Sequence, residues 1–153
     1  MNIIMTRSFN HIGPGQNQIF VVSSFARQLC QIKLNGGKGV IETGDITIIR
    51  DFLDVRDVVD AYYKLLVHGK AGEVYNVCSG HGITLKEIIM IMVDILEIEV
   101  EIHVNKNLIR PADNRIIVGS PEKIKKMIDW ELKYSIYDSL KDMIKYWMKN
   151  LEE

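Results

Sequence analysis

Apolar positions along this chain recur with two different periods, and each change of period predicts a change between strand and helix. The run over residues 2–9 has no polar face in its first half, so it predicts a buried strand with neighbours on both faces. Apolar residues at helical spacing predict a helix over 20–34, which Gly36 and Gly37 end. The first 37 residues are therefore predicted to contain both a strand and a helix.

The same alternation continues to the last residues. The further predicted elements are a turn at 10–16, strands at 40–43 and 48–53 that can form a hairpin, a helix from its cap Asp54 to Gly69, a strand at 73–78, a helix from the capping box Thr84–Glu87 to about residue 96, strands at 100–104 and 116–119, and helices at 120–128 and 135–151. No repeat or long linker divides the chain, so residues 1–153 are expected to form one α/β domain with α+β character.

Composition and charge narrow the class of protein. Apolar residues make up 47% and charged residues 25%, as in globular domains, and the net charge of −1 gives no basic field for nucleic acid. The longest apolar run, 88–92, is too short to span a membrane, and no signal-peptide pattern opens the chain. Cys30 and Cys78 are expected to be buried thiols in a reducing compartment. We therefore expect a cytoplasmic protein without nucleic-acid or membrane partners.

Several kinds of site are missing from the sequence. There is no phosphate loop of the nucleoside triphosphatases, no zinc-protease motif, and no glycine-rich turn between a strand and a helix. The four histidines lie in separate segments without paired spacing, so no metal site is expected.

Arginines and carboxylates gather in two segments, Arg50–Asp57 and Arg110–Asp113. Two guanidinium groups, from Arg50 and Arg110, could grip a diphosphate through their planar forks of donors, and a neighbouring carboxylate could accept hydrogen bonds from a ribose. The spacing alone leaves a second interpretation open, in which the pairs Arg50–Asp51 and Arg56–Asp57 are surface ion pairs or helix-start charges of little consequence.

Several longer motifs make the sequence resemble a known family. The segments are Phe9-Asn10-His11-Ile12-Gly13-Pro14-Gly15-Gln16, Phe20-Val21 with Phe25-Ala26-Arg27-Gln28, Arg50-Asp51-Phe52-Leu53-Asp54-Val55-Arg56-Asp57-Val58-Val59, Gly72-Glu73-Val74-Tyr75-Asn76-Val77-Cys78-Ser79-Gly80, Arg110-Pro111-Ala112-Asp113 and Tyr146-Trp147. In this order they resemble the extended short-chain dehydrogenases/reductases, the NAD-dependent epimerase/dehydratase family. Within it they are most similar to the GDP-mannose 4,6-dehydratases and GDP-4-keto-6-deoxymannose reductases.

The resemblance implies an architecture and a set of roles. In this family an N-terminal Rossmann half binds NAD(P), and a smaller C-terminal half closes over a sugar nucleotide. The chain resembles that C-terminal half with the last Rossmann strands, without the N-terminal Rossmann core. The implied roles are Asn10 for a phosphate, Ser8 and Phe9 beside the nicotinamide, Arg50 and Arg110 for the pyrophosphate, Asp113 for the ribose, Phe20 and Val21 beside the nucleobase, and Arg27 as a weaker candidate for the same pocket.

Departures from the family pattern limit the expected activity. The family's catalytic Ser/Thr and Tyr-x-x-x-Lys pair are absent, because the one such spacing, Tyr137 to Lys141, lies on the last predicted helix and is expected to be structural. Ser24 stands where relatives tend to carry a charged residue, which weakens the case for guanine. No catalytic residue is therefore assigned, and NAD(P) is expected in the parent enzyme but not on this chain alone.

These considerations give one main expectation and its alternatives. The chain is expected to bind a nucleoside diphosphate sugar of the GDP-mannose type without turning it over, with a separate Rossmann half as a possible partner. The apolar strand at 2–9 favours a homo-oligomer. The alternatives are a non-catalytic binding module or partner subunit, and an interaction protein with a decayed site. The base, the sugar and the type of reaction stay open.

Overall fold

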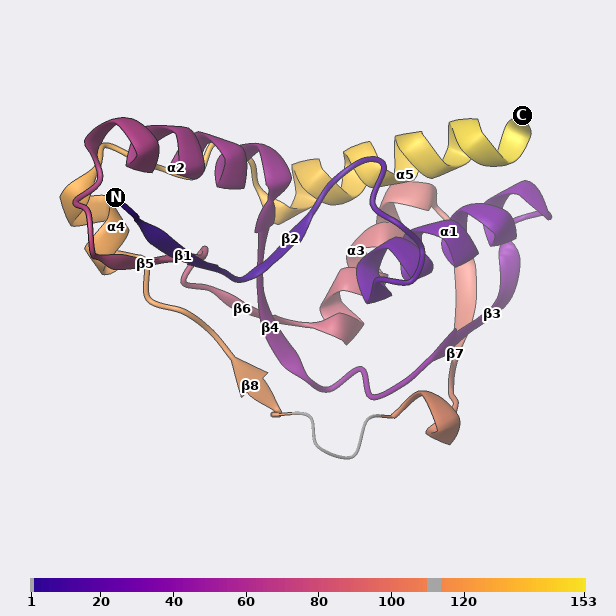
Figure 1. The fold of residues 1–153 in the computed structure, drawn as a ribbon. Coiled ribbons are helices and arrows are strands. Elements are labelled where there is room, and N and C mark those ends of the chain that lie inside the picture. Colours follow the sequence, from indigo (N-terminus) through magenta and orange to yellow (C-terminus); the bar gives the residue numbers. More distant parts are fainter. Residues whose placement is uncertain (1, 110–113) are drawn as a thin grey trace.

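The computed structural model describes residues 2–109 and 114–153. Helices α1, α3 and α5 pack together on one side, and α2 lies at the other end beside strands β1 and β5 (Figure 1). In chain order the elements are β1 (Met5–Ser8), β2 (Asn10–Ile12), α1 (Val21–Leu34), β3 (Lys38–Thr43), β4 (Ile49–Asp54), α2 (Val55–His68), β5 (Val74–Val77), β6 (Gly82–Thr84), α3 (Leu85–Leu96), β7 (Glu99–Val104), the 3-10 turn η1 (Lys106–Leu108), β8 (Ile116–Ile117), α4 (Glu122–Met127) and α5 (Ile136–Glu152).

The strands form three small sheets. β1 pairs with β5 in parallel, and β3 pairs with β7 in parallel along all six residues. β4 is the centre of the third sheet, in which β2 and β8 pair with it in parallel and β6 pairs with it in antiparallel orientation. The predicted mixed α/β class is confirmed, and β4 is the strand with the most partners.

Three predictions about strands are wrong. The hairpin of 40–43 with 48–53 does not form, because β3 takes β7 as its partner and an Asp45 side chain that accepts from Thr47 N turns the chain away. The predicted turn at 10–16 begins later, because Asn10–Ile12 pairs with β4 as β2. The strand at 2–9 is shorter and is not buried: Ile3 and Met5 are about half exposed. Short β6 was not predicted.

The helices follow their local signals more closely. Asp54 caps α2 by accepting from Arg56 N at 2.8 Å, and Thr84 and Glu87 form the predicted capping box of α3. A second capping box, Ser135 with Asp138, opens α5. Pro121 is the N-cap of α4 rather than part of its first turn. No helix within residues 2–109 and 114–153 has the length and apolar character needed to cross a membrane.

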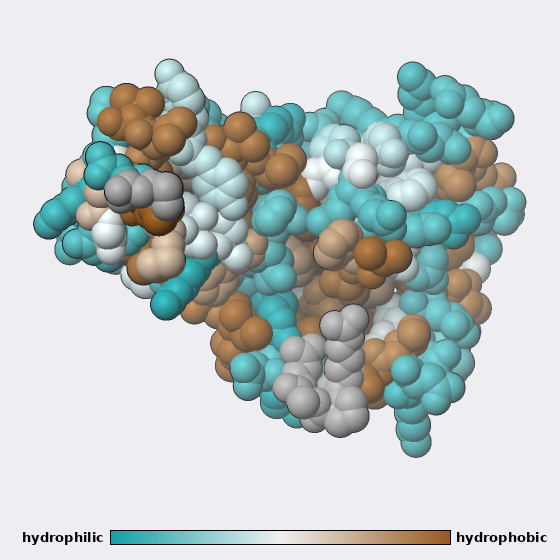
Figure 2. Space-filling view, in the orientation of Figure 1, coloured by the Kyte–Doolittle hydropathy of each residue, from teal (hydrophilic) through white to brown (hydrophobic). Residues whose placement is uncertain are grey.

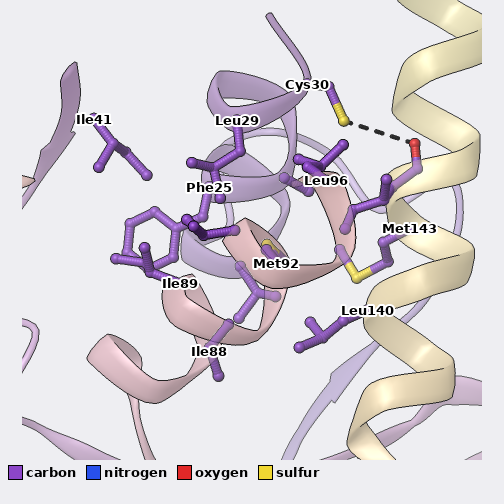
Figure 3. Packing of buried hydrophobic residues seen from close by; sticks show 14 of the residues in the cluster. Phe25, Leu29, Cys30, Ile41, Ile88, Ile89, Met92, Leu96, Leu140 and Met143 are labelled. Atoms are coloured by element: carbon purple, nitrogen blue, oxygen red, sulfur yellow. Dashed lines mark hydrogen bonds between the residues drawn. The ribbon is translucent and has the colours of Figure 1, made fainter. Parts of the chain in front are cut away.

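The larger core lies between α1, α3 and α5 (Figure 3). Phe25 and Leu29 of α1 meet Ile88, Ile89 and Met92 of α3, all at helical spacing. On the face of α1 toward α5, the Cys30 thiol donates to Ile144 O at 3.7 Å. Both cysteines are buried, as predicted, and burial raises the pKa of Cys30 to about 12 and that of Cys78 to about 11.

A smaller core between α2, β5 and α4 is joined to α5 by two buried carboxylates at the start of α2. Asp57 accepts from the backbone N–H groups of Lys133 and Tyr134 at 3.1 and 3.2 Å. Asp54 accepts from Ser139 Oγ at 2.6 Å and from Arg56, whose guanidinium stacks 3.6 Å from the centre of the Tyr134 ring. The alternative interpretation of Arg56–Asp57 as a surface ion pair is thus wrong, because each residue has other partners, although both lie at the start of α2.

The two carboxyl groups are shifted in opposite directions. Burial alone would raise the pKa of Asp54, but hydrogen bonds from Arg56 and Ser139 and the Arg56 charge outweigh it, so that pKa lies below 3.8. Burial raises the pKa of Asp57 above 3.8, and the N–H groups of Lys133 and Tyr134 offset this only in part. The two groups therefore influence stability with opposite signs.

Replacing Asp54 by Asn should flatten the acid side of the stability profile, because Asn keeps the capping oxygen but cannot titrate. A lowered folded-state pKa gives a contribution that is complete above about pH 3.8 and is lost as the pH falls through the folded-state value. The buried, charged Asp57 carboxylate instead lowers the stability of the fold at higher pH, and this loss is relieved as the pH falls through its raised pKa toward 3.8. Urea unfolding from about pH 6 to about pH 2 should show a smaller loss below pH 3.8 in D54N than in wild type. D57N, the control, should keep the wild-type loss there, and equal acid slopes in D54N and wild type would contradict the assignment.

Candidate functional site

A cavity of about 770 Å³ opens between the end of β1, the turn that leads into α1, and β4. In the space-filling view it is an apolar recess at the centre of the face shown (Figure 2). The predicted site residues that line it are Ser8, Phe9, Asn10, Phe20, Val21 and Arg50. The structure therefore gathers residues from three separate segments, at the carboxyl end of a parallel strand, which is where open α/β sheets bind ligands.

The path from β1 to α1 is fixed by close backbone contacts. Asn10 pairs in register with Phe52, and its Nδ2 donates to Asp51 O at 3.1 Å. A Cβ on Gly13 would lie 2.6 Å from Val55 Cγ1, so only glycine lets the turn approach α2 this closely. Farther on, Ser23 Oγ donates to Gln16 O at 2.6 Å and ties the turn to α1.

The first turn of α1 presents backbone donors to the cavity. Its N-cap residue, Phe20, forms no side-chain cap, and the turn contains no acidic residue. The N–H groups of a helix's first turn have no partner within the helix, and the helix dipole makes this end attractive to anions. Phe20 and Val21 themselves are about half exposed at the rim, where they offer apolar surface to a flat ring.

Arg50 brings a positive charge into the cavity wall. It lies on β4 opposite Ile83 of β6 and Ile117 of β8, so strands on both edges hold its backbone. The residue is only 7% exposed, and its Nη1 donates to Ile49 O at 2.9 Å. A guanidinium fixed in this way is suited to a planar, bidentate grip on phosphate oxygens.

The neighbouring Asp51 has a different role from the one expected. It is completely buried, and its carboxylate accepts from Ser79 N and Oγ at 2.8 and 2.6 Å, from Gly80 N at 3.0 Å and from Gly119 N at 3.2 Å. These four bonds tie β4 to the loop after β5 and to the segment after β8. Asp51 is buried, so the alternative interpretation of Arg50–Asp51 as a surface ion pair is wrong.

Other predicted residues lie elsewhere. Arg110 and Asp113 are outside the described residues, so their roles stay predictions. Arg27 is exposed on α1 and is not part of the cavity lining, and Tyr137 and Lys141 lie on α5, also away from it. The described residues contain no group of three or more His, Cys, Asp or Glu placed to hold a metal.

Among the lining residues that were not predicted as site residues, two carry polar side chains from the turn. His11, whose Nδ1 lies 3.2 Å from Phe9 O, and Gln16, whose Nε2 donates to His11 O at 2.9 Å, both line the cavity. The signal in the sequence that could have identified His11 and Gln16 is their position inside the turn motif of residues 9–16. Together the cavity offers one fixed cation, side-chain amides, helix N–H groups and an apolar rim, which suits a ligand with a phosphate and a flat ring.

Comparison with known proteins gives a consistent set of relatives. Residues 1–143 match the model of the family described as GDP-mannose 4,6 dehydratase. The chain is 40% identical over 151 residues to a GDP-6-deoxy-D-mannose reductase of Pseudomonas aeruginosa, covering 99% of this chain and 50% of that protein.

Two solved structures show the same likeness in three dimensions. RMD from Pseudomonas aeruginosa complexed with NADPH matches with a TM-score of 0.90 and 40% identity, over 97% of this chain and 49% of that chain. UDP-glucose 4-epimerase with UDP-glucose from Thermotoga maritima matches with a TM-score of 0.86 and 27% identity, over 99% and 47%. The chain thus spans about half the length of the relatives it matches.

Replacing Asp51 by Ala should destabilise the fold strongly, because four donors, two of them buried and two partly buried, lose their acceptor. We expect a loss of at least about 3 kcal/mol in the free energy of unfolding, measured by urea denaturation. The matched control is Asp94→Ala at an exposed carboxylate of α3, which should change stability by less than about 0.5 kcal/mol. Similar small losses in both variants would show that the Asp51 bonds do not hold β4 in place.

Proposed function

Because the chain belongs to the GDP-mannose 4,6-dehydratase family of nucleotide-sugar-processing proteins, we propose that its cavity binds a nucleoside diphosphate sugar of the GDP-mannose type. The observation that carries this proposal is the fixed Arg50 guanidinium, which lines the same cavity as Asn10 and the first turn of α1. In this arrangement Arg50 and Asn10 contact the phosphates, while Phe20 and Val21 lie against the base.

The sugar then extends toward Ser8 and Phe9 at the other end of the cavity. The lining segment runs from Ser8 through the turn to Val21, so a ligand whose base lies at Phe20 and whose diphosphate lies at Arg50 directs its sugar to the end of β1. Arg110 and Asp113 complete the proposal as the second pyrophosphate contact and the ribose contact. Arg27 is the weakest member of the set, because it does not reach the lining.

The described residues do not fit a whole NAD(P) molecule. A dinucleotide's pyrophosphate is bound by a tight glycine-rich turn between a strand and a helix. Here β1 and α1 are separated by β2 and a turn that Gln16 and Ser23 hold closed, so only Ser8 and Phe9 remain to meet a nicotinamide edge. The chain therefore supplies positioning, and the cofactor belongs to a further dinucleotide-binding domain.

An apolar surface beside the cavity is suited to that domain. We call it the α2 stripe: Val59, Tyr62, Tyr63 and Leu66 recur at helical spacing on the outer face of α2, and Leu66 is 82% exposed. Figure 2 shows apolar residues over α2 at the upper left. Beside it, β1 pairs with β5 alone among residues 2–109 and 114–153, although parallel sheets occur almost only with both faces covered. A domain with further parallel strands would cover both, and a second copy of the chain can cover them when that domain is absent.

Titration with GDP-mannose tests the proposed binding. A ligand that binds only the folded chain raises the melting temperature, so GDP-mannose should raise it and NADP alone should not. Arg50→Gln should weaken GDP-mannose binding about 10- to 100-fold by calorimetry, because it removes charge-assisted hydrogen bonds to phosphate.

Lys33→Gln removes an equal charge from the far end of α1 and is the matched control, with no expected change in affinity. A mixture of the chain, GDP-mannose and NADP(H) should show no turnover of the sugar nucleotide. A folded wild-type chain that fails to bind GDP-mannose at millimolar concentration would favour the decayed site over the binding module.

The α2 stripe should cause self-association of the isolated chain. Leu66→Glu places a charge at the most exposed position of the stripe and should shift light scattering from a dimer or larger assembly toward the monomer. Val40→Glu, at a similarly exposed apolar position on β3, should leave the assembly unchanged. A wild-type chain that stays monomeric at high concentration would count against the stripe as a docking surface.

A further inference from the structure

One hydrogen bond links the cavity to the α2 stripe. The Tyr62 hydroxyl lies 2.6 Å from Ser8 Oγ, and either oxygen can be the donor. Ser8 is the last residue of β1 and lines the cavity, whereas Tyr62 lies 54 positions later on α2 and is 42% exposed. The bond therefore joins a residue inside the proposed site to one outside it.

The hydrogen bond between the two hydroxyl groups can orient the Ser8 hydroxyl. A serine hydroxyl carries one proton and two lone pairs and rotates freely about its Cβ–Oγ bond unless a partner fixes it. At 2.6 Å the contact lies within the usual O–H···O range, so Tyr62 restricts the directions in which the Ser8 hydroxyl can point. When Tyr62 donates, the Ser8 proton stays available for an acceptor in the cavity.

We propose that Tyr62 is a positioning residue for the sugar end of the cavity, acting through Ser8. The inference rests on the proposed function, in which the sugar lies toward Ser8 and the base toward Phe20. Ser8 then donates to a hydroxyl or carbonyl oxygen of the hexose, with its direction set by Tyr62. The nucleoside diphosphate portion, held near Arg50 and α1, does not depend on this bond.

The test compares GDP-mannose with GDP, which lacks the sugar and has one more ionisable oxygen on its terminal phosphate. Tyr62→Phe keeps the ring but removes the hydroxyl, so it should weaken GDP-mannose binding roughly three- to tenfold by calorimetry, the effect of losing one oriented hydrogen bond. The affinity for GDP should stay within about twofold of wild type. Tyr137→Phe is the matched control, because Tyr137 is similarly exposed at 49% and lies on α5 away from the cavity, and it should change neither affinity.

A second substitution checks that Tyr62 acts through Ser8. Ser8→Ala alone should weaken GDP-mannose binding to a similar extent, and the double variant S8A/Y62F should lose little more than either single one. Equal losses for GDP and GDP-mannose in Y62F would show a merely structural role, and an unchanged GDP-mannose affinity would also overturn the inference. If wild type binds GDP but gains nothing from the sugar, this inference fails while the nucleotide site stands; if wild type binds neither, the proposed function fails and the inference falls with it.

Discussion

The structure depends on the hydrogen bonds that the buried carboxylates of β4 and of the start of α2 accept. Asp51, Asp54 and Asp57 are all buried, and each accepts hydrogen bonds from segments far away in sequence. A buried carboxylate without such donors would be costly, so these contacts must form together with the fold. Because Asp51 fixes β4 from one face, the adjacent Arg50 is held on the other face, toward the cavity. The position of the Arg50 guanidinium is therefore a consequence of the hydrogen bonds that Asp51 accepts on the other face of β4.

Local features of the fold could be predicted from sequence, and long-range features could not. The limits of α1, α3 and α5 follow from spacing and caps that lie within a few residues, such as Thr84 with Glu87. The pairing of β3 with β7 depends on strands separated by two helices, and no local signal excludes the hairpin. Arg50 and Asp51 show why the site was only partly predictable. They are adjacent and equally polar, and every residue from 50 to 54 is buried, so the alternation that would reveal their faces is missing.

The cavity and the α2 stripe adjoin each other. Because the chain spans about half the length of its relatives, this arrangement bears on where a further domain could dock. The cavity is bounded by β1, the turn, α1 and β4, and beyond Ser8 its edge continues into the outer face of α2 through Tyr62. A domain docked on the stripe would therefore lie next to the sugar end of a bound ligand rather than next to its base. Under the proposed function this is the geometry a cofactor-bearing domain needs, because its reactive group has to meet the sugar.

Under the proposed function, the chain binds the phosphates and another domain supplies the reactive group, so a chain to which we assign no catalytic residue can still contribute to a reaction. Contacts to parts of a substrate that do not react can be used to orient the part that does. In the proposed arrangement the diphosphate is fixed by Arg50, whose backbone is held on both edges of β4, and the sugar is directed by a hydroxyl that Tyr62 holds. Rigid anchors at both ends restrict the sugar to few orientations. The precision of such a site depends on β4 and β1 staying in register with β2 and β5, and hence on buried contacts that never touch the ligand.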